Sequence, residues 1–416
     1  MRSILLAVAC ATALLAACDM QADAARSAAT PPAADAERAA EAAEHEERMA
    51  EATTSTDSAV DARLPFVASP VASFDEPWAM AFLPDGRLLV TEKRGALRLF
   101  DPSTARSGSI SGVPEVAYGG QGGFGDVALH PDFSSNGIVY LSYAEAGDGD
   151  TRGAAVARAT LTLDDAGGGA LSEPKVIWRQ LPKMSGRGHY GHRLLFGPDG
   201  HLWVSSGDRQ HFDPAQDMRA NLGKILRLDA DGNVPADNPF ADKGGITAQI
   251  WSLGHRNPLG IAFDAQERLW VVEMGPAGGD EINLIERGGN YGYPVVSNGD
   301  HYDGKEIPDH GSAADTGFVA PKAWWTPVIS PSSLVFYRGD EFADWNGDAL
   351  IGALSGQALV RVEIDGDSAK EVARYPMGQR IRGVEQAPDG TLWLLEDSDE
   401  GKGGRLLRLA AAPASR

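Results

Sequence analysis

The residues best suited to proton transfer in this chain are a histidine and an aspartate nineteen positions apart. His189 stands in a glycine-rich segment, and Asp208 follows the apolar run 202–206, which is typical of a strand. A carboxylate beside an imidazole fixes its tautomer and raises its basicity. The chain contains no GxSxG or HExxH signature, and no GxGxxG opens a βαβ unit. A base without a nucleophile of its own is typical of proton abstraction coupled to hydride transfer, which requires a bound acceptor.

Arginines add a second kind of chemistry. Arg256, followed by Asn257, and the pair Arg380 and Arg382 each come directly before an apolar repeat. Side chains two positions apart on a strand point to the same face. Clustered guanidiniums in an acidic chain either pair with its surplus carboxylates or bind a ligand that carries several carboxylates. The sequence leaves both interpretations open.

The segment 273–283 (EMGPAGGDEIN) combines acidic side chains with a turn that is rich in main-chain carbonyls. Asp280 and Glu281 follow this turn, and the glycine-rich run 288–293 comes soon after. Carboxylate and carbonyl oxygens are the ligands that calcium takes in proteins. Because the spacing is not that of an EF-hand loop, the segment indicates a calcium site of another kind.

Short strands in pairs are the elements that must position these residues. An apolar run, a turn of the Pro-Asp-Gly type and a second apolar run recur from 79, 126, 193, 260, 333 and 383, about 61 residues apart. Such turns join antiparallel strands, and no long amphipathic helix lies between the copies. Repeats of this length with several strands indicate a propeller. We therefore expect an all-β fold, a six-bladed β-propeller with four-stranded antiparallel blades. A β-sandwich is the alternative.

Composition narrows the classes of function. The chain of 416 residues has 37 Lys+Arg against 58 Asp+Glu, a formal net charge of −21. It lacks the basic footprint that binds a phosphate backbone, so we expect no nucleic-acid partner. Its two cysteines cannot form a four-cysteine zinc site, an iron–sulfur cluster or a disulfide framework.

The first 63 residues predict a targeting segment and a spacer. A charged start, the apolar stretch 4–15 and small residues before Cys18 are typical of a signal peptide over 1–17, too short to span a membrane. Leu-Ala-Ala-Cys resembles the bacterial lipobox, whose cysteine is lipidated; a plain secretory signal is the alternative. Residues 18–63 are rich in Ala and Glu and predict a flexible spacer before the propeller of 64–416. We expect a periplasmic protein anchored to the membrane through Cys18.

A resemblance to a known family rests on five motifs in order. They are GGQGGFGDVALHPDF at 119–133, HYGHRLLFGPDG at 189–200, NLGKILRLDADGNVPADNPF at 221–240, LGHRNPLGIAFD at 253–264 and GPAGGDEINLIERGGNYGYP at 275–294. From about residue 64 to 409 the chain resembles the soluble aldose sugar dehydrogenases that depend on pyrroloquinoline quinone (PQQ), the glucose/sorbosone dehydrogenase family. The resemblance implies a six-bladed propeller that oxidises the C1 hydroxyl of aldose sugars to lactones by hydride transfer to Ca²⁺-bound PQQ. An electron acceptor of the respiratory chain is the implied partner. The alternative is a non-catalytic propeller that binds a ligand or a partner protein.

The resemblance also implies a role for each candidate residue. His189 is the expected general base, and Asp208 is the carboxylate that orients it. The expected cofactor contacts are Gln121, Arg256, Asn257, Tyr302, Arg380 and Arg382. The expected calcium ligands are the carbonyls of Gly275 and Pro276, with Glu281 and the carbonyl of Tyr291 at a second, structural calcium and Asp280 beside them. Two positions depart from the family pattern: Ser355 replaces a common lysine, and Gly188 replaces the aspartate of glucose-specialised members, which favours a broad aldose oxidiser.

Overall fold

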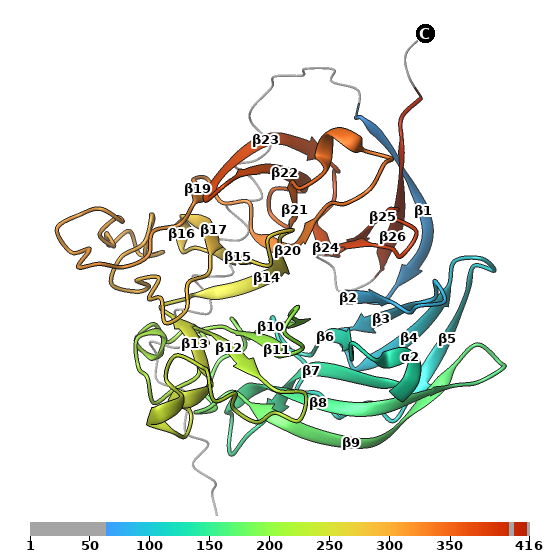
Figure 1. Ribbon diagram of the computed structural model, residues 1–416, viewed down its shortest axis with the longest axis horizontal. Helices are drawn as coiled ribbons and strands as arrows, with labels where there is room; N and C mark the ends of the chain where they lie inside the picture. Colours follow the sequence, from blue (N-terminus) through green and yellow to red (C-terminus); the bar gives the residue numbers. More distant parts are fainter. Residues whose placement is uncertain (1–63, 399–402, 414–416) are drawn as a thin grey trace, which may run out of the picture.

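Almost all regular structure in the described part of this chain is β-strand. The computed structural model describes residues 64–398 and 403–413. Its sheets stand around a common centre, as Figure 1 shows, so the expected all-β propeller is confirmed. The signal peptide, the spacer and Cys18 lie outside the described residues. Within 64–398 and 403–413, no helix has both the length and the apolar character needed to cross a bilayer.

Four sheets contain four strands each. The first comprises β1 (Phe66–Phe74), β26 (Gly404–Ala411), β25 (Leu392–Glu396) and β24 (Ile381–Gln386). The second comprises β10 (Gly191–Phe196), β11 (Leu202–Ser206), β12 (Lys224–Leu228) and β13 (Ile250–Leu253). The third comprises β14 (Asn257–Phe263), β15 (Leu269–Met274), β17 (Asp280–Leu284) and β19 (Ala323–Trp325). The fourth comprises β20 (Pro331–Phe336), β21 (Ala349–Ala353), β22 (Ala358–Asp365) and β23 (Ser368–Pro376).

A fifth sheet has eight strands and departs from the expected separate blades. Its first run is β2 (Pro77–Phe82), β3 (Leu88–Glu92), β4 (Ala96–Asp101) and β5 (Arg106–Ser111). Its second run is β6 (Phe124–Leu129), β7 (Ile138–Ala146), β8 (Arg152–Leu163) and β9 (Gly169–Arg179). The two runs are each antiparallel, and a short parallel pairing of Ile110 and Ser111 with Gly169 and Ala170 joins them. The 11-residue β9 is long enough to reach β5.

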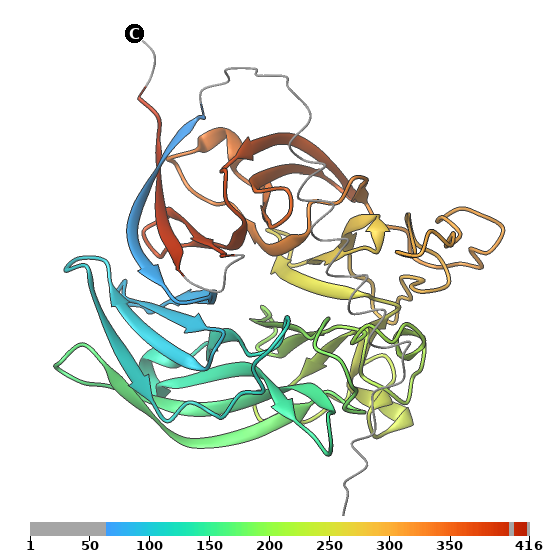
Figure 2. The same ribbon diagram turned by 180° about the vertical axis from the view of Figure 1, so that it is seen from behind.

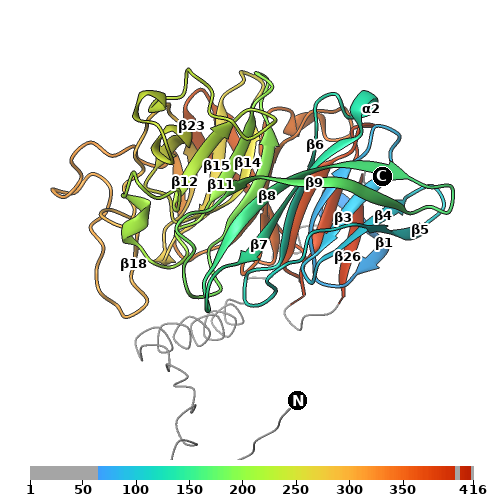
Figure 3. The same ribbon diagram turned by 90° about the horizontal axis from the view of Figure 1, so that it is seen from below.

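The remaining elements are short. They are the two-stranded sheet of β16 (Ala277–Gly278) and β18 (Gly299–Asp300), the one-turn helix α2 (Phe133–Asn136), and the 3₁₀ turns η1 (Asp213–Ala215), η2 (Ala241–Lys243), η3 (Thr247–Gln249) and η4 (Ala343–Trp345). A long excursion between β18 and β19 leaves the ring of sheets, as the orange segment in Figures 1 and 3 shows.

The strands nearest the centre form a closed ring. They are β2, β6, β10, β14, β20 and β24, and each contacts the next around the circle, with β24 returning to β2. All six repeats of the sequence contribute one of these strands. The same ring is seen from behind in Figure 2. The two ends of the propeller meet in the first sheet, where β1 pairs with β26. The pairing runs from Phe66 opposite Ala411 to Phe74 opposite Gly404.

Each innermost strand carries a register shift within its first four residues. Such bulges leave a backbone group outside the ladder and turn the strand. At three of these bulges a buried hydroxyl accepts the freed N–H and donates to a carbonyl of the next innermost strand. These hydroxyls belong to Thr91, Ser142 and Ser205, which donate to Gly125, His192 and Pro258 respectively. Neighbouring innermost strands are therefore hydrogen-bonded to one another at these three bulges.

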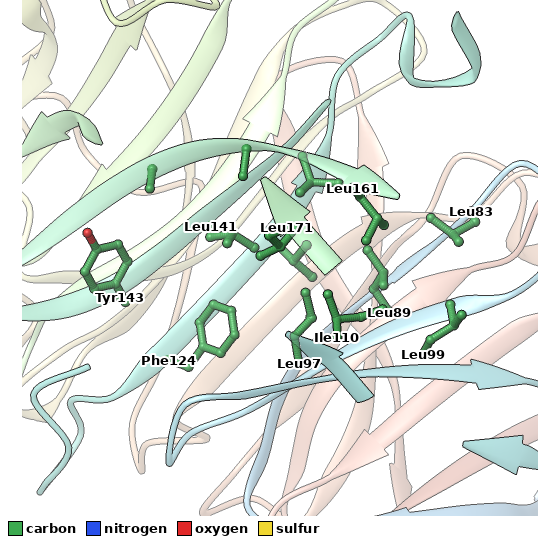
Figure 4. Packing of buried hydrophobic residues seen from close by; sticks show 14 of the residues in the cluster. Leu83, Leu89, Leu97, Leu99, Ile110, Phe124, Leu141, Tyr143, Leu161 and Leu171 are labelled. Carbon is green, nitrogen blue, oxygen red and sulfur yellow. The ribbon is translucent and has the colours of Figure 1, made fainter. Parts of the chain in front are cut away.

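Apolar side chains fill the space between adjacent sheets. Figure 4 shows one such cluster, to which β3 and β4 contribute Leu89 and Leu97, while β6 and β7 contribute Phe124 and Leu141. All four side chains are almost completely buried. Burying a side chain of this size stabilises a fold by about 1.5–3 kcal/mol, so these clusters make the ring a rigid scaffold.

One charged side chain occupies the centre of the ring. Arg193 on β10 is buried, and its guanidinium contacts all five other innermost strands. The contacts are the Trp78 ring at 4.3 Å on β2, the Asp126 carboxylate at 3.6 Å on β6, and the carbonyls of Leu259 at 2.6 Å on β14, Ser332 at 2.5 Å on β20 and Arg382 at 3.3 Å on β24. A cation buried this way is stable only because its donors and its charge are matched.

Replacing Arg193 by methionine should therefore destabilise the protein by about 3–5 kcal/mol, because it leaves buried carbonyls and Asp126 without their partner. The midpoint of chemical denaturation measures this loss. Arg219→Met is the control, since its side chain is 88% exposed and, among the described residues, pairs only with Asp217. It should change stability by less than about 0.5 kcal/mol. Equal stability of the two variants would contradict the central role of Arg193.

Candidate functional site

The direction of the strands brings the candidate residues to one end of the ring. In an antiparallel hairpin, the start of the first strand lies beside the end of the second. Gln121, His189, Arg256 and Arg380 come just before β6, β10, β14 and β24, whereas Asp208 and Gly275 come just after β11 and β15. Segments that are far apart in the sequence therefore meet on the same face of the propeller.

His189 and Asp208 form a buried hydrogen-bonded pair. The imidazole Nδ1 lies 2.7 Å from Asp208 Oδ1, and both side chains are almost completely buried. Burial, and then the charge of Arg256, lower the pKa of His189. Burial opposes ionisation of Asp208, but the charge and hydrogen bond of His189 outweigh it and lower the pKa of this carboxyl. His189 Nε2 makes no hydrogen bond to the described residues and is not buried, so it is available as a proton acceptor.

The backbone around this pair is tightly constrained. Gly207 must be glycine, since a Cβ there would lie 2.3 Å from the carbonyl oxygen of His189. The Asp208 N–H donates to the carbonyl of Arg256 at 2.8 Å, and the Arg209 N–H donates to that of His189 at 3.2 Å. His189 and Arg209 both have φ values in the left-handed region, 48° and 58°. Non-glycine residues in this region cost about 1–3 kcal/mol each and cluster at functional sites.

Predicted cofactor contacts surround the base. The Gln121 side-chain oxygen accepts the His189 N–H at 2.8 Å. Arg256 donates through Nη2 to the Tyr302 hydroxyl at 3.1 Å and through Nη1 to the Gly275 carbonyl at 2.6 Å. Asn257 Oδ1 accepts the Gly191 N–H at 3.3 Å. One hydrogen-bonded group thus includes five of the residues that the sequence singled out and links them to the base.

The predicted carbonyl donors to calcium already have hydrogen-bond partners. Arg256 binds the carbonyl of Gly275, and the Gly278 N–H binds that of Pro276 at 3.0 Å. Asp280 accepts the N–H groups of Gly275, Ile329 and Ser330, and burial raises its pKa to about 7. In this structure the Asp280 carboxylate fixes the Gly275 turn against the loop before β20.

Glu281 belongs to a second acidic group below this turn. Its carboxylate and that of Glu273 both accept from Asn283 Nδ2, at 3.1 and 3.0 Å. Burial, and then the charge of Glu273, raise the pKa of Glu281 well above its usual range. The Tyr291 ring stacks on His255, which is hydrogen-bonded to Glu273 at 2.8 Å. Both glutamates line a cavity of about 10 Å³, which is the size of one water molecule or ion.

The arginine pair lies in the first sheet, where it shares one carboxylate. Asp397 Oδ2 is 2.6 Å from Arg382 Nη2 and 3.3 Å from Arg380 Nε. Lys93, directly after β3, is a further cation of this group that the sequence analysis missed. Burial, and then the charge of Arg382, lower the pKa of Lys93. Its position just after a second strand, the same as that of Asp208, is the signal that could have identified it.

The site has the donors that a cofactor with several carboxylates needs. Among the described residues, the Nε atoms of Arg256 and Arg382 are buried without a hydrogen-bond partner. Three cations, Arg380, Arg382 and Lys93, lie near the buried carboxylate of Asp397. A second buried carboxylate near Lys93, that of Glu76, also pairs with a further cation, Arg94. A polyanionic quinone fits this surplus of charge and donors. For calcium the structure offers backbone oxygens and the Glu273–Glu281 pair. Within the described ranges, no three or more His, Cys, Asp or Glu side chains are arranged so that they could hold a metal ion.

Ser355 fills the position where the family pattern has a lysine. Its hydroxyl is 2.7 Å from that of Ser330, whose N–H donates to Asp280. The serine therefore extends the hydrogen bonds that hold the Gly275 turn and brings no charge to the site.

The chain is similar to a known family and to solved structures of sugar dehydrogenases. The family model described as "Glucose / Sorbosone dehydrogenase" matches residues 74–408. Aldose sugar dehydrogenase YliI of Escherichia coli (strain K12) is 39% identical over 332 residues, which cover 79% of this chain and 89% of the relative. The crystal structure of the soluble aldose sugar dehydrogenase of Escherichia coli in the apo-form superimposes with a TM-score of 0.79 and 38% identity, covering 83% of this chain and all of that one. The PQQ-bound form of aldose sugar dehydrogenase from Streptomyces coelicolor has a TM-score of 0.67 and 28% identity, covering 83% and 98%.

The imidazole of His189 should be mostly neutral at pH 7, with its proton on Nδ1. Its lowered pKa lies below the ordinary value of 6.5, so protonation begins only as the pH falls further. Asp208→Asn should lower this pKa again, because the carboxylate favours the imidazolium. Nitrogen-15 NMR of the imidazoles measures both values, and His189→Gln identifies the signal. A titration midpoint above 6.5 in the unaltered protein would contradict the geometry.

Proposed function

The chain belongs to the glucose/sorbosone dehydrogenase family, whose members are oxidoreductases of sugar CH–OH groups, and we propose that it oxidises the C1 hydroxyl of aldose sugars to lactones with PQQ. The observation that carries this proposal is the buried His189–Asp208 pair, whose imidazole Nε2 is left open on the same face where Arg256 and Arg382 have buried Nε donors without described partners. The same pair, together with the dehydrogenase relatives, favours an enzyme over a non-catalytic ligand-binding propeller.

In the proposed reaction His189 acts as the base. Its Nε2 accepts the proton of the C1 hydroxyl, and the resulting imidazolium is stabilised by Asp208 through the 2.7 Å hydrogen bond at Nδ1. Because the pair is buried, water competes little for the carboxylate, and the ring keeps its orientation. Gln121 holds the main chain of His189 from the opposite side, so the base is fixed before a sugar binds.

The cofactor-binding roles are assigned to residues of the same face. Arg380, Arg382 and Lys93 would bind carboxylates of PQQ, while Arg256, Asn257 and Tyr302 would contact its ring. When bound, the quinone supplies an acceptor for the C1 hydride. Calcium would be held by the carbonyls of Gly275 and Pro276, and a second ion by Glu281 and the carbonyl of Tyr291, with Asp280 in support. A divalent cation would also relieve the repulsion between Glu273 and Glu281.

Several further features complete the proposal. Counting the eight-stranded sheet as two blades gives a six-bladed propeller. A signal peptide over 1–17 and a lipidated Cys18, followed by a spacer to residue 63, would tether the enzyme to the membrane in the periplasm. There it would pass electrons to an acceptor of the respiratory chain.

Reconstitution tests the reaction directly. The purified apo-protein is mixed with PQQ and Ca²⁺, and an artificial dye is followed during incubation with a panel of aldoses. We expect dye reduction by several aldoses, its loss on chelation of calcium, and a decrease of at least about 10²-fold in His189→Ala, because the proton acceptor is removed. No dye reduction by the unaltered protein would refute the proposed activity, and full activity of His189→Ala would refute the mechanism.

Measuring cofactor binding distinguishes the residue proposed to accept the proton from the residues proposed to bind PQQ. Quenching of tryptophan fluorescence by PQQ measures affinity without turnover. His189→Gln should bind PQQ as the unaltered protein does, whereas Arg382→Met should bind it at least about tenfold more weakly, since one charge-assisted contact is lost. Equal affinity of both variants would place the cofactor elsewhere.

The tether is tested in cells. The chain with Cys18→Ser should move from the membrane fraction to the soluble fraction, because a thiol is needed for lipid attachment, and metabolic labelling with a radioactive fatty acid should be lost. Labelling of the serine variant at the level of the unaltered chain would refute Cys18 as the anchor.

A further inference from the structure

Gln210 lies beside the base and has no part in the site described so far. It follows Asp208 by two residues, and its own N–H donates to Asp208 Oδ1 at 2.9 Å. Its side chain reaches the residue that precedes His189: a Cβ built on Gly188 would lie 2.3 Å from Gln210 Oε1 and 2.8 Å from Nε2. The carboxamide therefore packs flat against the backbone that leads into the base.

The local backbone holds Gln210 in this place. Arg209, Gln210 and Phe212 all have φ values near 60°, in the left-handed region. Arg209 is anchored on both sides, by its N–H to the His189 carbonyl and by its guanidinium over the Tyr190 ring at 3.9 Å. The strained turn thus fixes the direction in which the Gln210 side chain points away from the backbone. Strained backbone of this kind clusters at functional sites.

The carboxamide is polar but unpaired. Gln210 is half-buried, and neither its oxygen nor its nitrogen forms a hydrogen bond to the described part of the chain. An amide offers one acceptor and two donors in a single plane, which suits a hydroxyl that both gives and takes a hydrogen bond. The neighbouring Gln121, in contrast, uses its oxygen on the His189 N–H. Gln210 thus places a free amide beside the backbone that leads into His189.

Resting on the proposed aldose oxidation, we propose that the Gln210 carboxamide binds a sugar hydroxyl close to the reacting C1 position and thereby determines which aldoses are accepted. Gly188 is part of the same device, because the absence of a side chain at that position makes the room that the carboxamide occupies. Gln210 is a substrate-binding residue in this proposal and takes no part in proton transfer.

A cycle of three variants tests the proposal. Gln210→Ala removes the carboxamide. Gly188→Ala displaces it, since the new methyl group meets only the movable end of the Gln210 side chain and the φ of Gly188 lies outside the left-handed region. The double variant combines the two changes. Each is measured for KM and kcat with several aldoses, for the pH profile, and for binding of 1,5-anhydro-D-glucitol, an analogue that lacks the C1 hydroxyl and needs no turnover.

We expect Gln210→Ala to weaken binding of the analogue and raise KM by about 3- to 10-fold, the effect of one neutral hydrogen bond, unequally among the aldoses. The pH profile and PQQ affinity should not move, since His189 and Asp208 remain. Gly188→Ala should reproduce the effect, and the double variant should show no further loss. Gln266→Ala is the matched control, because Gln266 is exposed in the β14–β15 turn at the opposite end of the ring.

Different results would refute the proposed function and the proposed role of Gln210. If the unaltered holoprotein oxidises no aldose, the proposed function is wrong, and analogue binding still decides the role of Gln210. If Gln210→Ala changes neither analogue binding nor any KM by twofold, or if the effects of the two single variants add, the role of Gln210 is refuted. A shifted pH profile in Gln210→Ala would refute it too, by placing this residue in the support of the base.

Discussion

The guanidinium of Arg193 is the interaction on which the ring depends. A propeller must bring the first strand of every sheet to one axis, where there is too little room for a large apolar core and too little water to hydrate the backbone. Arg193 meets this constraint with one planar cation, whose donors reach carbonyls on three strands while its face lies on Trp78 and its charge meets Asp126. The contact with the carbonyl of Arg382 also connects the centre to the group that would bind the cofactor.

The reactive face follows from this arrangement because rigid strands end in loops with special backbone geometry. The hydroxyls of Thr91, Ser142 and Ser205 join three pairs of neighbouring innermost strands at the bulges, close to the loops that carry Gln121 and His189. The left-handed φ values of His189 and its neighbours are tolerated only because this support over-determines them. The acidic protein thereby maintains a local group of unpaired cationic donors above a well-packed scaffold.

Periodic features were the most predictable from sequence. Every repeat forms an inner hairpin or the first strand of one. This could be predicted because an apolar run and a Pro-Asp-Gly turn determine structure within a few residues of the chain. His189, Asp208 and Arg256 stand out in the sequence because of their residue types beside strand ends, and the structure brings them together. Lys93 and Gln210 were missed, because a lysine or a glutamine acquires meaning only from neighbours that are distant in sequence. The parallel joining of β5 to β9 was likewise unpredictable, since it depends on how far a long strand extends in space.

The pairing of β1 with β26 has a consequence for the order of events in the cell. The sheet that presents Arg380 and Arg382 is built from the beginning and the end of the propeller, so it has no complete form while the chain is still being synthesised. Until the last strand emerges, β1 lacks its partner and the sheet that carries the arginine pair is incomplete. A chain threaded unfolded through a membrane would meet the same condition, which makes the closing strand a natural checkpoint: the cofactor face forms only in a chain that has arrived whole.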